Sequence, residues 1–153
     1  MSLVNDRLKQ LNIVLPPAPA PAANYVPYVK SNKLIFVSGQ IPILNGKLVT
    51  GKIGKNIEIE DAKTAARLCG LAIVSQLNEA TDLDLDKIKR IVKLGGFVNC
   101  IDEFTQQPEI INGASDLMVE VFGDKGKHSR FAVGTNSLPR NVVVEIEAVA
   151  EIH

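Results

Sequence analysis

The sequence predicts an α+β domain in which a single sheet carries two helices on one face. Three observations lead to this fold class. Apolar residues alternate in two pairs of segments, over residues 25–39 and 131–151, and two stretches with helical spacing lie between these pairs. A long apolar segment separates the two helical stretches. The resulting order β-β-α-β-α-β-β is typical of a sheet covered by helices on one side.

A short helix and a proline-rich arm precede this domain. Apolar residues recur at helical spacing over residues 2–11, which predicts an amphipathic helix. Residues 15–23 (LPPAPAPAA) are rich in proline, which excludes a helix and favours extended polyproline II. We expect this arm to lie on the surface of its own chain or to reach a neighbour. The chain is therefore divided into the helix and arm, residues 1–24, and a domain of residues 25–153.

The first strands form hairpins. Residues 25–39 alternate as two strands around a Ser-Asn turn, which predicts a β-hairpin. Pro27 has no N–H to donate, so the first of these strands is expected at a sheet edge. An Asn-Gly pair predicts a second, small ribbon over residues 43–49.

Two helices and a long strand follow. Residues 62–79 and 108–123 have helical spacing, and the first helix has acidic residues at its start. Between them, residues 87–101 predict a long strand. Its Gly95-Gly96 pair suggests a bulge, or a place where another backbone or a ligand comes close.

The last two strands cover residues 131–137 and 142–151, joined by LPRN. The final strand has one wholly apolar face, and its other face carries two valines around Glu145 and Glu147. Because the helices cover only one side of the sheet, the second, partly apolar face needs another cover. Self-association is the expected one.

Composition excludes several classes of protein. The 153 residues suffice for one domain. The 17 acidic and 17 basic side chains give a net charge of zero, which argues against a nucleic-acid-binding protein. The one candidate basic segment, residues 86–93, alternates in charge sign like an exposed helix end. The sequence contains no apolar run of about 18 residues and no signal peptide, so we expect a soluble, cytoplasmic protein without membrane contact.

Motifs for metal and cofactor binding are missing from the sequence. Cys69 and Cys100 form no CxxC pair and have no paired histidines around them, which argues against zinc and leaves a disulfide open. No Ser-His-Asp arrangement, phosphate loop or dinucleotide fingerprint occurs. We expect no metal and no cofactor.

Arg130 is the first candidate functional residue. Along an extended strand it shares a face with His128, Ala132 and Gly134, whose small members leave space above the guanidinium. A guanidinium binds a carboxylate with two parallel hydrogen bonds, which an ammonium cannot do. The alternative is a surface arginine at a strand start.

Glu145, Glu147 and His128 are further candidates. The two glutamates are two positions apart and share a face, and paired carboxylates can divide acid and base roles. The alternative is the solvated face of an edge strand. His128 is the one histidine before the C-terminal residue, and its alternative is a polar turn residue.

Three motifs carry a resemblance to a known family. They are SGQIP at residues 38–42, an arginine eight positions before Leu-Pro, and VEIEAVA at residues 144–150. In this order and spacing they resemble the Rid family, the reactive-intermediate deaminases, also called YjgF-like or endoribonuclease L-PSP-like proteins. The resemblance runs from Tyr25 to Ile152. The N-terminal extension, a longer second helix and His128 in place of the usual proline resemble a longer, less characterised branch.

The resemblance implies a chorismate-mutase-like fold and a homotrimer built around a β-barrel, with active sites in the clefts between subunits. It implies hydrolysis of enamines and imines of amino acids, such as 2-aminoacrylate, to 2-keto acids and ammonia. Arg130 would clamp the substrate carboxylate and Glu145 would position the attacking water. The other implied site residues are Tyr28, Ser38, Gly39, Asn112, His128 and Ala132.

Three functions are compared. The first is this hydrolytic deaminase. The second is a protein that binds or senses small carboxylates in the same cleft between subunits, without turnover. The third is the ribonuclease of the older family name, which the zero net charge and the lack of an aromatic, basic surface disfavour.

Overall fold

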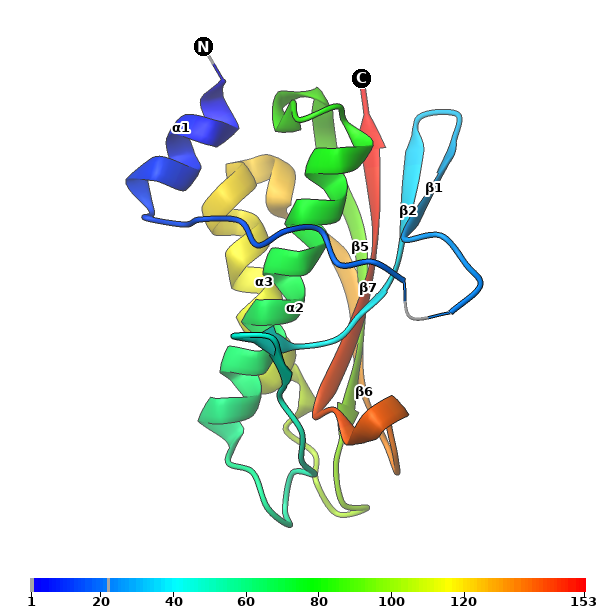
Figure 1. Ribbon diagram of the computed structural model, residues 1–153. Helices are drawn as coiled ribbons and strands as arrows, with labels where there is room; N and C mark the ends of the chain where they lie inside the picture. The colour runs from blue at the N-terminus through cyan, green and yellow to red at the C-terminus, as the bar shows by residue number, and fades with distance from the viewer. Residues whose placement is uncertain (1, 22) are drawn as a thin grey trace.

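The computed structural model describes residues 2–21 and 23–153. Its main feature is a five-stranded sheet that carries helices on one face, as Figure 1 shows. In order across the sheet, the strands are β1 (Tyr28–Ser31), β2 (Leu34–Gln40), β7 (Val144–Ile152), β5 (Ile88–Asn99) and β6 (Ser129–Thr135). Neighbours are antiparallel except β5 and β6, which are parallel. The predicted α+β class and the predicted order of elements are confirmed.

Two long helices, α2 (Ile59–Ala80) and α3 (Gln107–Phe122), cover the sheet and pack on each other. Glycine permits their close approach, since a Cβ atom at Gly113 would lie 3.1 Å from the backbone nitrogen of Arg67. The apolar face of β7 is buried beneath them. The core residues that β7 and the segment before it contribute are Val142, Val144, Ile146, Ala148 and Ala150.

The N-terminal helix is shorter than predicted by one residue at each end, α1 (Leu3–Gln10). The Ser2 hydroxyl accepts a hydrogen bond from the backbone N–H of Asn5 at 3.2 Å, as an N-cap residue does. Val4 and Leu8 are buried in the main core, and α1 contacts α3. The helix is therefore part of the packed unit.

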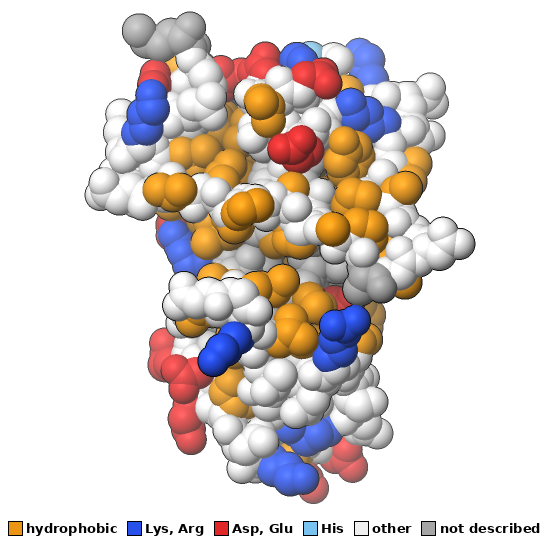
Figure 2. All heavy atoms as spheres, viewed as in Figure 1, with side chains coloured by type: hydrophobic (Ala, Val, Ile, Leu, Met, Phe, Trp, Pro, Cys, Tyr) orange, Lys and Arg blue, Asp and Glu red, His pale blue; other side chains and the backbone are white. Residues whose placement is uncertain are grey.

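The proline-rich arm crosses α2 and continues toward β1 and β2 (Figure 1). Two buried polar side chains of α2 hold it. Ser75 Oγ donates to the carbonyl of Pro16 at 2.8 Å, and Gln76 Nε2 donates to that of Pro19 at 2.7 Å. Figure 2 shows apolar side chains gathered along this course. Of the two expectations, the arm thus lies on its own chain.

Both hairpins form, with a shorter first strand. Strand β1 begins at Tyr28 rather than at residue 25, so Pro27 lies just before the strand, which is at the sheet edge as predicted. The turn residue Asn32 has a φ of 52°. The small ribbon consists of β3 (Ile43–Leu44) and β4 (Lys47–Leu48), and its Asn-Gly turn has the positive φ values of a type I′ turn.

Of the alternatives expected for the two glycines of β5, the bulge is wrong. The irregular pairing of β5 with β7 occurs earlier, between Ile88 and Lys93, and no bulge lies at the glycines. At Gly96 a Cβ atom would lie 2.6 Å from the side chain of Ile111, and at Gly95 it would lie 2.6 Å from the ring of Phe131. Side chains of α3, β6 and β7, rather than a second backbone, fill this space.

The sheet face away from the helices has apolar side chains exposed to solvent. Phe97 and Phe131 form a T-shaped pair with ring centroids 5.3 Å apart, and Lys93 Nζ lies 5.2 Å from the centre of the Phe131 ring. We call this the open face, and its apolar residues are Val29, Phe36, Phe97, Phe131, Val133 and Val149. A patch of this kind marks an interaction surface.

Two smaller points complete the fold. Cys69 and Cys100 are both buried and are not joined by a disulfide. Within the part of the chain that the structure describes, no helix combines the length and the apolar character needed to cross a membrane.

Candidate active site

Arg130 lies on the edge strand β6, on the side of the sheet that faces the helices. It pairs with Leu94, which is fully buried beneath them. The guanidinium reaches α3, where Nη1 donates to Ser115 Oγ at 3.0 Å and Nη2 lies 3.4 Å from the carbonyl oxygen of Pro108. Its other N–H groups have no partner among the described residues and can bind a ligand.

Three of the predicted site residues gather near Arg130. Asn112 follows Pro108 by four positions, so it is on the α3 face that Arg130 contacts. Ala132 is two positions after Arg130 on β6 and packs against the core. His128 precedes β6, and its Nε2 lies 2.9 Å from the Oγ of Ser115.

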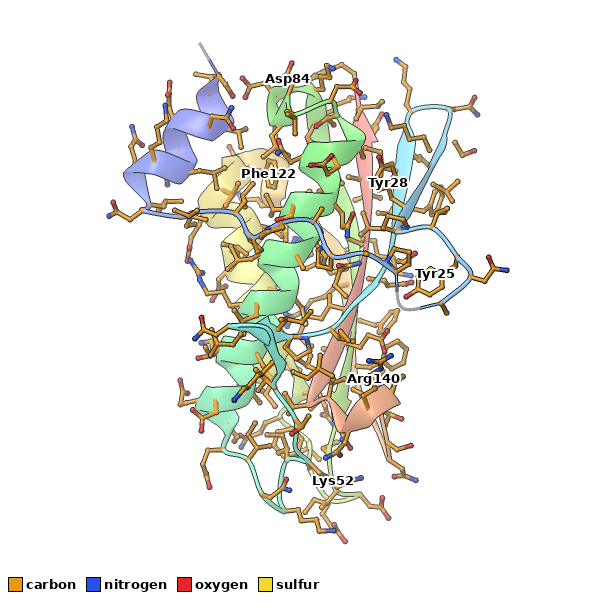
Figure 3. All side chains as sticks on the ribbon, in the orientation of Figure 1. Tyr25, Tyr28, Lys52, Asp84, Phe122 and Arg140 are labelled. Carbon is orange, nitrogen blue, oxygen red and sulfur yellow. The ribbon has the colours of Figure 1, made fainter. Side chains whose placement is uncertain are left out.

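Glu145 lies on the opposite side of the sheet. It pairs with Phe97 of the open face and lines a cleft of about 410 Å³. Tyr25 and Arg140 line the same cleft, and Figure 3 shows them on the same side of the molecule, one above the other. The carboxylate is half-buried, and this burial raises the pKa of Glu145.

Gly39 and Ser38 support this cleft. A Cβ atom at Gly39 would lie 3.1 Å from Glu145 Cδ. Any residue other than glycine at this position would therefore displace the carboxylate. Ser38 Oγ donates to the carbonyl of Val26 at 2.8 Å, and its backbone N–H donates to that of Pro27 at 2.9 Å. These bonds hold the segment that carries Tyr25.

Sequence reasoning missed several residues of the cleft. The arm contributes part of its wall, through Pro19 and Pro21. Tyr25 lines the cleft, whereas the predicted Tyr28 packs on the edge of the core. Arg140 has a φ of 55°, which is uncommon outside glycine and could not be foreseen from its neighbours. In the sequence, only the Leu-Pro pair before Arg140 indicated a loop at this position.

The structure separates Arg130 from Glu145 within one chain. They belong to opposite faces of the sheet, and β5 lies between their strands. The chain therefore presents two half-sites, one around the guanidinium at the sheet edge and one around the carboxylate in the cleft. Among the described residues, no three His, Cys, Asp or Glu side chains come together as a metal ion would require.

The fold and these half-sites match a known family. Residues 5–152 match the model of a family described as YjgF/chorismate mutase-like, a description that also suggests endoribonuclease activity. The chain belongs to the YjgF family. This confirms the resemblance that the SGQIP, arginine and VEIEAVA motifs carry.

Relatives in this YjgF family match nearly the whole chain. Protein TCP17 of Trypanosoma cruzi is 46% identical over 98% of this chain and 94% of its own. The crystal structure of Atu1372 from Agrobacterium tumefaciens, a protein of unknown function, is 46% identical with a TM-score of 0.91, over 98% of this chain and 92% of that one. A candidate endoribonuclease from Shewanella oneidensis is 33% identical with a TM-score of 0.93, over 97% and 99%.

Proposed function

We propose that this YjgF-family chain hydrolyses enamines and imines of amino acids to 2-keto acids and ammonia. The observation that carries the proposal is the pair of half-sites. One offers a guanidinium with free N–H groups, and the other offers a half-buried carboxylate of raised pKa in a cleft. A carboxylate clamp and a proton-transfer group are what this hydrolysis needs.

The complete site forms between two copies of the chain in a homotrimer. Arg130 lies on an edge strand, where a neighbouring subunit can approach, while Glu145 belongs to the side of the open face. The apolar residues of the open face favour association, and a closed barrel would bury them. Arg130 of one subunit then meets the Glu145 cleft of the next.

Each step of the reaction has a group in this site. The substrate carboxylate pairs with Arg130. Glu145 accepts a proton from water as the water oxygen attacks the C=N carbon, which gives a carbinolamine. Glu145 gives this proton to the imine nitrogen, which completes the carbinolamine, and then moves the hydroxyl proton of the carbinolamine to the same nitrogen. The C–N bond breaks as the C=O bond forms, and ammonia leaves with a 2-keto acid. An enamine is first protonated at carbon to its imine. In the proposal Ser38 supports the cleft through its bonds to the segment that carries Tyr25, and Asn112 lies on the α3 face near Arg130.

A raised pKa suits the role of Glu145. A general base whose pKa is nearer the working pH accepts a proton from water more readily, and its protonated form is populated enough to act afterwards as the acid toward the leaving nitrogen. Burial in the cleft is the cause of the shift.

The test is a panel of 2-aminoacrylate and bulkier imines generated in solution, with keto-acid release measured with and without the protein. Acceleration supports the deaminase. No acceleration, together with keto acids that raise the melting temperature, would instead make the chain a binding or sensing protein. The ribonuclease alternative is tested by measuring RNA binding at several salt concentrations. We expect no salt-dependent binding because the net charge is zero.

A further inference from the structure

A row of hydrogen bonds runs behind the guanidinium of Arg130. Arg130 Nη1 lies 3.0 Å from Ser115 Oγ, and Ser115 Oγ lies 2.9 Å from His128 Nε2. On the other side of the imidazole, His128 Nδ1 lies 2.6 Å from the carbonyl oxygen of Gly126. The row therefore connects the guanidinium to a backbone carbonyl through two side chains.

With a neutral imidazole, the partners determine the direction of every bond in the row. The carbonyl oxygen of Gly126 can only accept, so His128 Nδ1 carries a hydrogen and the neutral ring offers Nε2 as an acceptor. The Ser115 hydroxyl then donates to Nε2. Its oxygen lone pairs are left to accept from Arg130 Nη1, which can only donate. His128 thus orients the hydroxyl that holds Arg130.

The row is anchored to α3 at two points. Ser115 belongs to that helix. Gly126 ends the short 3₁₀ turn η2 (Gly123–Gly126), which packs tightly on the same helix. A Cβ atom at Gly126 would lie 2.5 Å from the carbonyl carbon of Met118 and 2.9 Å from Val119 Cα. The acceptor for His128 is therefore held by backbone packing.

We propose that Ser115 and His128 are positioning residues that hold the guanidinium of Arg130 in the orientation that binds a carboxylate. The inference rests on the proposed function of Arg130 as the carboxylate clamp. His128 acts through Ser115 and does not itself bind the substrate carboxylate. A flexible arginine that is already oriented loses less conformational freedom on binding, so the ligand binds more tightly.

The first test compares a keto acid with its carboxamide. We expect His128→Ala and Ser115→Ala to weaken binding of 2-oxobutanoate about tenfold, the usual effect of one hydrogen bond to a charged group. Binding of 2-oxobutanamide, which has no carboxylate, should not change. Equal weakening of both ligands, or no weakening of 2-oxobutanoate binding, would overturn the proposal.

A matched pair of variants tests the bond to Ser115 itself. The Gln side chain in His128→Gln places an acceptor near the position of Nε2, whereas the Asn side chain in His128→Asn reaches only as far as Nδ1 and Gly126. We expect the Gln variant to recover keto-acid binding and the Asn variant to resemble His128→Ala. The reverse order would contradict the proposal.

A third measurement needs no ligand. The ¹⁵N NMR signals of the Arg130 side chain should report slow rotation of a restrained guanidinium in the wild type and faster rotation in His128→Ala. Unchanged rotation would overturn the positioning role.

Binding in the wild type separates the two proposals. If the wild type binds no keto acid at all, Arg130 is not a carboxylate clamp and the proposed function fails with it. If it binds and His128→Ala binds equally well, only the positioning proposal fails.

Discussion

Gly39 lies directly against the carboxylate of Glu145, so that a Cβ atom at position 39 would come within 3.1 Å of Glu145 Cδ and closer still to Oε1. The two residues come from neighbouring strands, at the point where β2 leaves its regular pairing with β7 after Val37. The contact determines where the carboxylate lies in the cleft.

The first prediction concerns this contact. In Gly39→Ala the methyl group displaces the end of the flexible Glu145 side chain, which costs little stability, so we expect the free energy of unfolding to change by less than about 1 kcal/mol. Displacement of the carboxylate by about 1 Å should lower turnover about 100-fold. Steady-state kinetics and denaturant unfolding measure both. Wild-type turnover in a folded Gly39→Ala variant would contradict the role of the contact.

The second prediction separates the two glutamates. Glu145→Gln is nearly isosteric, so keto-acid binding should persist while turnover falls about 100-fold or more, as expected for a positioned acid or base. Glu147→Gln is the matched control, because Glu147 is exposed on the same strand. If Glu147→Gln is the inactive variant and Glu145→Gln turns over normally, the assignment is wrong.

The third prediction follows from the raised pKa of Glu145. The folded protein holds this proton to a higher pH than the unfolded chain, so the carboxyl stabilises the fold at low pH, and this contribution is lost as the pH rises through the folded pKa. Between the ordinary glutamate value of about 4.3 and that pKa, the wild type should lose stability relative to Glu145→Gln. Urea unfolding across this pH range measures the difference, and a difference that stays constant would contradict the shift.

The fourth prediction concerns Arg130. Arg130→Lys keeps the charge but cannot form two parallel hydrogen bonds, so we expect carboxylate binding to weaken by about 2–5 kcal/mol. Arg130→Ala should abolish binding and turnover. Calorimetry with a 2-keto acid measures the affinity. An Arg130→Ala variant that binds as tightly as the wild type would show that Arg130 is a surface arginine with no role in carboxylate binding.

The fifth prediction concerns assembly. We expect the wild type to sediment at about three times the chain mass of 16.5 kDa, and Phe36→Glu to sediment as a monomer because it would bury an unpaired carboxylate. Leu83→Glu is the control, since Leu83 is also exposed but lies outside the open face. A wild-type monomer at micromolar concentration would refute the trimer and leave each half-site incomplete.

Much of the fold could be predicted from local pattern. The Asn-Gly turn between β3 and β4, the helical spacing in α2 and the alternation in β7 each depend on neighbours a few positions away. Such signals survive in the sequence because turn chemistry and side-chain period are local properties. The motifs around Ser38, Arg130 and Glu145 likewise identified the family before the fold was known.

The remaining features depend on contacts between distant segments. No local pattern indicates that Gln76 holds the arm at Pro19, that Arg140 lines the cleft of Glu145, or that Ser115 connects His128 to Arg130. The sequence placed Arg130 and Glu145 on strands, and their separation onto opposite faces followed only from the strand order and register of the sheet. Alternation along a strand says which residues share its faces, but packing against the helices decides which face is covered and which is open to another subunit.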